Sequence, residues 1–299
     1  MKCRHQIIAY RSRSGSLPNG KWPLVFNLQQ GYKELPVSIP CGKCIPCRLN
    51  KTREWGVRCM HEAKMHDNNA FVTLTYNEQN VNKNYSLVKE DFTKFIKQAR
   101  YNYGKLRYFH CGEYGENFNR PHHHACLFGI NIQDKELFTI KKGIKIYTSE
   151  KLTKIWGHGF TTISDVTFES ACYVASYIQK KIGGEMADSH YQGREPEYVT
   201  MSKKPGIGAE FVKSYQNDIY KKDKVIIDSK IILRPPRYYD KLYEALHPDS
   251  FKSIHERRQL KNVKTKQQLN NEYERRPLLE EYDRYKQTFV KRFYEENQK

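Results

Sequence analysis

The sequence is short of apolar residues and has no long run of them. Hydrophobic side chains make up 38% of its 299 residues, below the usual share for soluble domains, which predicts one moderate core. No run reaches the roughly 18 consecutive apolar residues of a transmembrane helix, so we expect no membrane partner. The first residues lack the apolar stretch of a secretory signal. We therefore expect the eight cysteines to lie in a reducing compartment, bound to metal or buried rather than in disulfides.

Acidic residues are also scarce relative to basic ones. The chain has 52 Lys and Arg against 33 Asp and Glu, a formal net charge of +19. Such an excess points to a polyanionic partner, and nucleic acid is the first candidate. The 22 tyrosines and 14 phenylalanines, interleaved with basic residues, suit base stacking combined with phosphate contacts. A merely soluble basic protein with half-buried strand tyrosines is the plainer alternative.

The order of the expected elements predicts an α+β fold, with paired antiparallel strands and helices packed on one face of the sheet. A small Cys-rich N-terminal module and a charged helical C-terminal tail flank it. We expect residues 185–210 to form a loop. The predicted regions are 1–65, 66–235 and 236–299. Strands are expected at 24–28, 35–39, 71–76, 105–113, 122–130 and 159–166, and helices at 48–65, 91–101 and 168–182.

Three adjacent histidines begin the strand expected at 122–130. Side chains alternate along a strand, so His122 and His124 point to one face and His123 to the other. Two imidazoles on one face can converge on one divalent ion. Glu113 ends the preceding strand and lies across the hairpin from His122, which makes it the third candidate ligand. This set suits Mg²⁺ or Mn²⁺ when a substrate supplies phosphate oxygens; a surface histidine cluster is the alternative.

Two tyrosines and two lysines share one face of the helix expected at 168–182: Tyr173, Tyr177, Lys180 and Lys181. Another face is apolar enough to be the core side, so the core is served without the tyrosines. A phenol with a pKa of about 10 is a poor nucleophile, but a neighbouring ammonium favours the phenolate. The alternative is that the tyrosines lie at the edge of the core.

Cys41, Cys44 and Cys47 are spaced tightly enough to place three thiolates on one Zn²⁺ or an iron–sulfur site. A structural zinc needs a fourth ligand, and Zn²⁺ would then fasten the turn-rich N-terminus to the following helix. Three thiols in a turn without metal are the alternative. The candidates for the fourth ligand are Cys3 first, then His5 or Cys59.

Basic side chains near these motifs are candidates for contacts with a DNA backbone. A solvated charged face is the alternative for each of them. The tail at 236–299 interleaves charges with Tyr and Leu. It could pack on the core, contact DNA or recruit a host helicase or other replication protein. The candidate DNA-binding residues are Arg48, Lys51, Arg58, Lys181, Lys203 and Lys204.

The motifs and their order resemble the HUH endonuclease superfamily, and within it the replication initiators of gokushoviruses, a subfamily of the Microviridae. Each motif is short, and their joint presence makes the resemblance specific. His123 departs from it, because the family usually has a hydrophobic or aromatic residue there. The matching segments are 71–76, 112–115, 121–129 and 173–180, with 41–48 and 204–208 in addition.

The resemblance implies an HUH-like antiparallel sheet and a rolling-circle replication initiator that nicks single-stranded origin DNA. Tyr173 or Tyr177 would form a 5′-phosphotyrosine link, and the second tyrosine would allow the strand to be rejoined into a circle. Mg²⁺ or Mn²⁺ would be held by His122, His124 and Glu113, with Lys180 stabilising the phenolate or the phosphate. The expected location is the host bacterial cytoplasm.

Two other functions stay open at this point. One is a non-catalytic, zinc-dependent nucleic-acid-binding protein with structural histidines. The other is a metal-dependent phosphodiesterase that uses activated water, in which the tyrosines only position the substrate. A covalent DNA–protein adduct separates the nickase from both.

Overall fold

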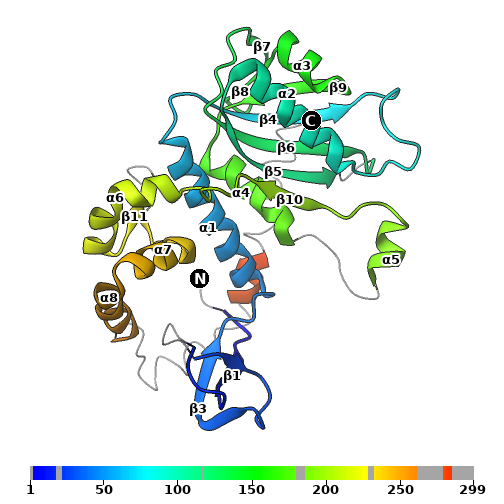
Figure 1. Ribbon diagram of the computed structural model, residues 1–299. Coiled ribbons are helices and arrows are strands. Elements are labelled where there is room, and N and C mark those ends of the chain that lie inside the picture. The colour runs from blue at the N-terminus through cyan, green and yellow to red at the C-terminus, as the bar shows by residue number, and fades with distance from the viewer. Residues whose placement is uncertain are drawn as a thin grey trace. The chain divides into compact units, whose positions relative to one another are not determined.

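The computed structural model describes residues 3–17, 22–115, 118–179, 186–227, 232–260 and 279–284 (Figure 1). These residues belong to two compact units. The first unit contains the described residues up to Lys51 together with residues 279–284. The second contains the described residues from Thr52 to Leu260. Helix α1, Ile45–Ala63, runs through the boundary between them.

The second unit is built on a sheet to which the described residues contribute seven strands. Their order is β10-β5-β6-β4-β9-β8-β7, and every neighbouring pair is antiparallel. The predicted α+β class and antiparallel sheet are confirmed. The strands are β4 (Asn69–Tyr76), β5 (Arg107–Tyr114), β6 (Pro121–Phe128), β7 (Glu136–Lys141), β8 (Ile144–Thr148), β9 (Gly159–Ser164) and β10 (Tyr198–Met201).

Helices cover both faces of this sheet, so the prediction of helices on one face is wrong. Alternate β4 side chains such as Val72 and Leu74 pack with helices α2 (Lys89–Tyr103) and α3 (Glu150–Trp156). Phe71, between them in register, packs with α1 and helix α4. The reason is visible in β4, where apolar side chains occupy both alternating sets and both must be buried.

Helix α4, Phe168–Ser176, begins at a capping box in which Thr167 accepts from the backbone N–H of Ser170. It is shorter than the helix predicted at 168–182, because a 3₁₀ turn, Tyr177–Gln179, follows it. The helix also lies close to α1 at Gly56. A Cβ on Gly56 would be 2.6 Å from the Sγ atom of Cys172, so a larger residue would push the two helices apart.

The predicted loop at 185–210 is only partly a loop. It contains the short helix α5, Met186–Tyr191, and the edge strand β10, which pairs with β5. The Tyr-Val-Thr-Met run of β10 has the β-branched and aromatic character of a strand. Four residues are too few to give a clear alternating pattern, which is why the surrounding turn residues dominated the prediction.

The C-terminal part of the second unit is helical, as expected. Its own apolar cluster forms around the fully buried Tyr239. Arg258 ties it together through ion pairs with Asp223 and Asp240. None of the described helices has the length and apolarity to cross a membrane. The elements are α6 (Ala209–Lys222), β11 (Val225–Ile226), β12 (Ile232–Leu233), α7 (Arg237–Leu246) and α8 (Pro248–Leu260).

The first unit is a small antiparallel sheet of order β2-β1-β3. Its strands are β1 (Ile7–Ser12), β2 (Leu24–Val25) and β3 (Gly31–Ile39). Arg4 donates two hydrogen bonds to the buried carboxylate of Asp283. The two ends of the sequence therefore contribute to one folded unit.

His61 on α1 makes the stability of the second unit dependent on pH. It is fully buried, stacks on Phe211 and bonds Tyr239, and burial lowers its pKa to about 4. In the unfolded chain its pKa is about 6.5, so the unfolded state takes up the proton first as pH falls. We expect the free energy of unfolding to drop by about 2 kcal/mol from His61 alone between pH 7 and pH 5.

Urea denaturation at both pH values measures this drop. The His61→Gln variant should show a smaller loss than the wild type, whereas His255→Gln, on an exposed position of α8, should show the same loss. An unchanged pH dependence in His61→Gln would assign the effect to other groups.

Candidate active site

The histidine strand β6 lies between β5 and β4. Glu113 pairs with His122, as the hairpin predicted, and Cys111 pairs with His124. On the other side, Thr73 of β4 pairs with His124. This register brings the carboxylate of β5 and the hydroxyl of β4 to the face of the sheet that carries His122 and His124.

Both nitrogens of His124 are engaged on that face. Nε2 lies 2.6 Å from Glu113 Oε1, and Nδ1 lies 3.0 Å from the hydroxyl of Thr73. The ring of His122 is nearly parallel to that of His124, with centroids 6.4 Å apart. His122 Nδ1–H donates to the carbonyl of Arg120 at 2.7 Å, and burial lowers its pKa. A neutral His122 with that hydrogen bond carries its lone pair on Nε2, the state needed of a metal ligand.

The donor types of His122, His124 and Glu113 suit Mg²⁺ or Mn²⁺. Their arrangement is not yet that of a closed metal site. Within the described residues, the group whose ligand atoms all lie within 4.8 Å of one another is a cysteine group, and this set is not included. His124 and Glu113 are already in contact, so the ring of His122 must turn towards them before one ion can reach all three.

The two tyrosines reach the same carboxylate. Tyr173 donates to Glu113 Oε1 at 2.8 Å, and Tyr177 donates to the hydroxyl of Tyr173 at 2.8 Å. Both side chains belong to the apolar cluster between α4 and the sheet, with only 4% and 2% exposure. The prediction that they lie off the core side is wrong, because a phenol on α4 can reach Glu113 only by burying its ring. Lys180 and Lys181 lie outside the described residues.

The surroundings of both phenols favour the protonated form. Burial raises the pKa of Tyr173 and of Tyr177, and the carboxylate of Glu113 raises both further. A phenolate would be deprived of water and would face a negative charge. In this arrangement the tyrosines are held as hydrogen-bond donors, and Glu113 is the acceptor nearest to their protons.

His123 points to the opposite face, as alternation predicted, and lies in a buried chain of hydrogen bonds. Tyr76 donates to Asp91, so its oxygen accepts from His123 Nε2–H. His123 Nδ1 then accepts from His110 Nε2–H, and His110 Nδ1 accepts from Thr200. Burial lowers the pKa of His123 to about 3 and that of His110 well below its ordinary value, so both rings are neutral.

This chain explains how a histidine is accommodated where a hydrophobic residue is usual. Every polar atom of the ring has a buried partner, which removes the desolvation penalty of the substitution. The sequence analysis identified none of those partners. Tyr76, Asp91 and His110 were placed in strands and helices, but strand pairing across β5 and β6 was needed to bring them together.

His110 and His123 should therefore be energetically coupled. Replacing either one with Leu leaves the other with an unpaired buried nitrogen, and we expect each single change to lower the free energy of unfolding by about 1–3 kcal/mol. The double change should cost at least about 1 kcal/mol less than the sum of the two. Chemical denaturation of the four proteins measures the coupling. The matched pair His110→Leu with Tyr220→Phe, in a separate cluster, should be additive, and additivity in the histidine pair would contradict the chain.

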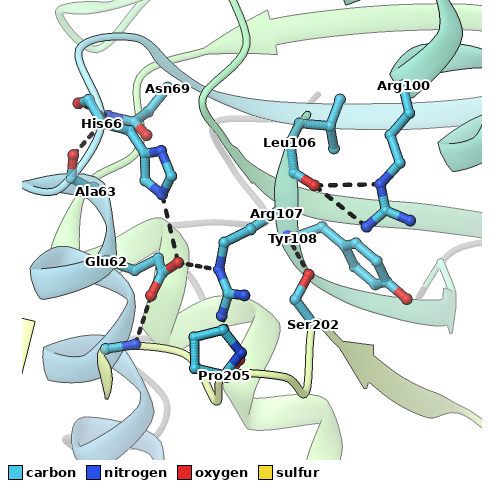
Figure 2. Close-up of polar contacts among 11 residues, drawn as sticks. Glu62, Ala63, His66, Asn69, Arg100, Leu106, Arg107, Tyr108, Ser202 and Pro205 are labelled. Carbon is cyan, nitrogen blue, oxygen red and sulfur yellow. Dashed lines mark hydrogen bonds and ion pairs between the residues drawn. The ribbon is translucent and has the colours of Figure 1, made fainter. Parts of the chain in front are cut away.

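A loop between β10 and α6 presents Lys203 and Lys204, both exposed. Figure 2 shows how it is anchored to α1 and β5. The buried Glu62 accepts from the backbone N–H of Gly208 at 2.6 Å and pairs with Arg107. Arg107 also donates to the carbonyl of Pro205 at 2.6 Å. These contacts fix the loop backbone while the lysines stay in solvent.

Arg58, another candidate for DNA contacts, is instead largely committed to this loop. It donates to the carbonyl of Ile207 at 3.0 Å, and its guanidinium lies 3.8 Å from the centre of the Trp55 ring and 4.0 Å from that of Tyr238. Its role here is to hold the loop against α1. Arg48 is half-buried and Lys51 exposed on the part of α1 that belongs to the first unit.

The cysteine cluster is assembled in the first unit. Cys3, Cys41, Cys44 and Cys47 place their Sγ atoms within 4.8 Å of one another, and the group could hold a metal ion. The preferred fourth ligand, Cys3, is therefore the one brought into place. Cys59, an alternative, is buried in the core of the second unit, and His5 lies 3.7 Å from Glu280. Two backbone N–H groups, of Cys44 and Lys43, lower the pKa of Cys41 to about 6.

Comparison with known proteins agrees with this geometry. The family model for the phage replication-associated protein ORF2 matches residues 69–182. Replication-associated protein VP4 of Bdellovibrio phage phiMH2K is 34% identical over 256 residues, which cover 82% of this chain and 80% of the relative. Replication-associated protein ORF2 of Spiroplasma virus 4 is 37% identical over 238 residues, covering 74% and 73%. The chain belongs to the phage replication-associated protein family.

Membership of this family confirms the resemblance to phage replication initiators found in the sequence motifs. A further relative, replication-associated protein ORF4 of Chlamydia phage 1, is 27% identical, covering 73% of this chain and 57% of its own. The segment matched by the family model begins at β4 and includes both the histidine strand and the tyrosines. None of the solved structures matches this family member.

Proposed function

We propose that this protein initiates rolling-circle replication by nicking single-stranded origin DNA with a tyrosine nucleophile. One observation carries the proposal: Tyr177, Tyr173, Glu113 and His124 form a continuous chain of hydrogen bonds. Two phenols, one carboxylate and an imidazole on one sheet face supply a nucleophile, a proton acceptor and metal-binding groups. A structural core has no need of that combination.

In the proposed reaction, a tyrosine oxygen attacks the scissile phosphorus. A bond forms between the phenolic oxygen and phosphorus, and the bond between phosphorus and the 3′ oxygen breaks. The phenolic proton passes to Glu113, to which Tyr173 already donates, and the leaving 3′ oxygen takes up a proton. The products are a 5′-phosphotyrosine and a free 3′ hydroxyl that primes synthesis.

Two tyrosines allow the cycle to be completed at one site. The hydroxyls lie 2.8 Å apart, so each can take the other's place beside Glu113. The second tyrosine cuts the regenerated origin, and the freed 3′ hydroxyl attacks the first phosphotyrosine and closes the circle. Both rings are buried, so a scissile phosphate reaches them only after the residues beside α4 make room.

His122, His124 and Glu113 would hold Mg²⁺ or Mn²⁺, which would polarise the scissile phosphate and offset the negative charge of Glu113. Thr73 orients His124 through Nδ1, and Arg120 orients His122. Lys203 and Lys204 contact the DNA backbone from their anchored loop, with Arg48, Lys51, Lys180 and Lys181 as further basic contacts. The protein acts in the host bacterial cytoplasm, where the C-terminal region would meet host helicase or other replication proteins.

Tyrosine variants test the reaction directly. Labelled single-stranded origin DNA is incubated with the protein and Mn²⁺, and the products are separated on a denaturing gel. We expect a labelled protein–DNA adduct that weakens in Tyr173→Phe or Tyr177→Phe and is absent in the double variant, because no phenol then remains beside Glu113. His124→Ala should also abolish it.

The matched control is Tyr198→Phe, since the Tyr198 hydroxyl is buried without a hydrogen-bond partner among the described residues. It should form the adduct as the wild type does. Metal-dependent cutting without an adduct would favour the phosphodiesterase that uses water, and DNA binding without cutting would favour a non-catalytic binding protein.

We also propose that the four-cysteine group binds a structural Zn²⁺. Four thiolates are the donor set of closed tetrahedral zinc sites. Cys3 precedes β1 and Cys41 follows β3, and these strands pair at Ile7 and Ile39. Bound zinc would therefore fasten the two ends of the sheet beside the start of α1.

Native mass spectrometry of the purified chain should show one Zn²⁺ per molecule. Cys44→Ser should lose the ion and melt at a lower temperature, because only three thiolates remain. Cys126→Ala, in the core of the second unit, should retain it. Full zinc retention in Cys44→Ser would contradict the assignment.

A further inference from the structure

The first unit is far more basic than the chain as a whole. Residues 1–51 contain nine Lys or Arg and a single acidic residue, Glu34, a net charge of +8 from nine minus one. Of the basic residues, Arg11, Arg13 and Lys33 are exposed on or beside the strands of the small sheet. A surface with so little negative charge to balance it favours contact with a polyanion.

The same sheet carries unusually exposed apolar rings. Trp22 is 37% exposed and Phe26 62% exposed, on either side of β2. Trp22 meets Tyr32 of β3 edge to face, with centroids 5.9 Å apart. The guanidinium of Arg13 lies 6.0 Å from the centre of the Tyr32 ring, and Arg13 is held there by a hydrogen bond to the carbonyl of Gly31 at 3.0 Å. Arg13, Tyr32 and Trp22 thus form a row of alternating charge and ring.

We infer that this sheet binds single-stranded nucleic acid, with bases stacking on Trp22 and Tyr32 and phosphates contacting Arg11, Arg13 and Lys33. Stacking on aromatic rings combined with a basic surface is how proteins bind single strands without regard to sequence. A duplex keeps its bases stacked on one another and cannot use exposed rings in this way. The inference rests on the proposed function, because it supplies that protein with a second grip on its substrate.

This surface is separate from the proposed nicking site. Its residues all belong to the first unit, whereas the histidines, Glu113 and the tyrosines belong to the second. It also depends on the cysteine group, which closes the sheet at the ends of β1 and β3. The consequence is a binding surface that holds the strand whether or not a phosphate lies beside Glu113.

Fluorescence anisotropy with fluorescein-labelled (dT)₂₀ tests the inference on the full-length protein, without added Mg²⁺ or Mn²⁺. We expect Trp22→Ala and Tyr32→Ala each to weaken binding about tenfold, and the double variant about a hundredfold, since each ring stacks on one base. Arg13→Ala should weaken binding and also flatten its dependence on salt concentration. Binding to a 20-base-pair duplex should change little in the two ring variants.

The matched control is Phe138→Ala, which removes a ring 68% exposed on β7 of the second unit. It should leave (dT)₂₀ affinity unchanged. Zinc content equal to wild type shows that each variant of the first unit is folded. Unchanged (dT)₂₀ affinity in the Trp22 and Tyr32 double variant would overturn the inference, as would equal losses on single strand and duplex. A change in molecular mass by light scattering would overturn it too, because the rings would then lie between two copies of the chain.

The adduct assay distinguishes this inference from the proposed function. At saturating origin DNA, the Trp22 and Tyr32 double variant should still form the covalent adduct, because its second unit is intact. If the wild type forms no adduct but binds (dT)₂₀ through these rings, the nickase proposal fails and the binding surface stands.

Discussion

The buried carboxylate of Glu113 is the interaction around which the second unit is organised. A carboxylate removed from water is costly unless hydrogen-bond donors surround it. Here the donors come from β6, through His124, and from α4, through Tyr173. Glu113 itself is on β5, so one side chain joins the histidine hairpin to the helix that carries the tyrosines. The position of α4 on the sheet follows from satisfying this charge.

The same arrangement sets the protein at rest. The hydrogen bonds that satisfy Glu113 also keep the phenols protonated, and burial of their rings keeps water and substrate away from them. Stability and reactivity therefore draw on the same donors. Chemistry at this site requires that Glu113 find a substitute for the tyrosine proton, and the proposed metal site provides one beside it.

Local pattern was sufficient to predict the histidine hairpin, because side-chain alternation and a short connection fix both face and register. It was also sufficient for the four cysteines, whose spacing alone limits the geometry. It failed for the tyrosines, since a helical stripe shows which residues share a face but not which face the sheet covers. It missed β10 and the partners of His123, because those contacts join segments about 90 residues apart, such as His110 and Thr200.

The contact between Arg4 and Asp283 has a consequence for how the chain is made. The two residues are 279 positions apart, yet they pair within the same small unit. During synthesis, the N-terminal sheet emerges from the ribosome first but cannot acquire this partner until nearly the whole polypeptide has followed. The second unit, whose described segments lie between the two, has by then been translated in full. The part of the protein that is translated first is thus completed last, and a chain cut short by premature termination would carry Arg4 without its carboxylate.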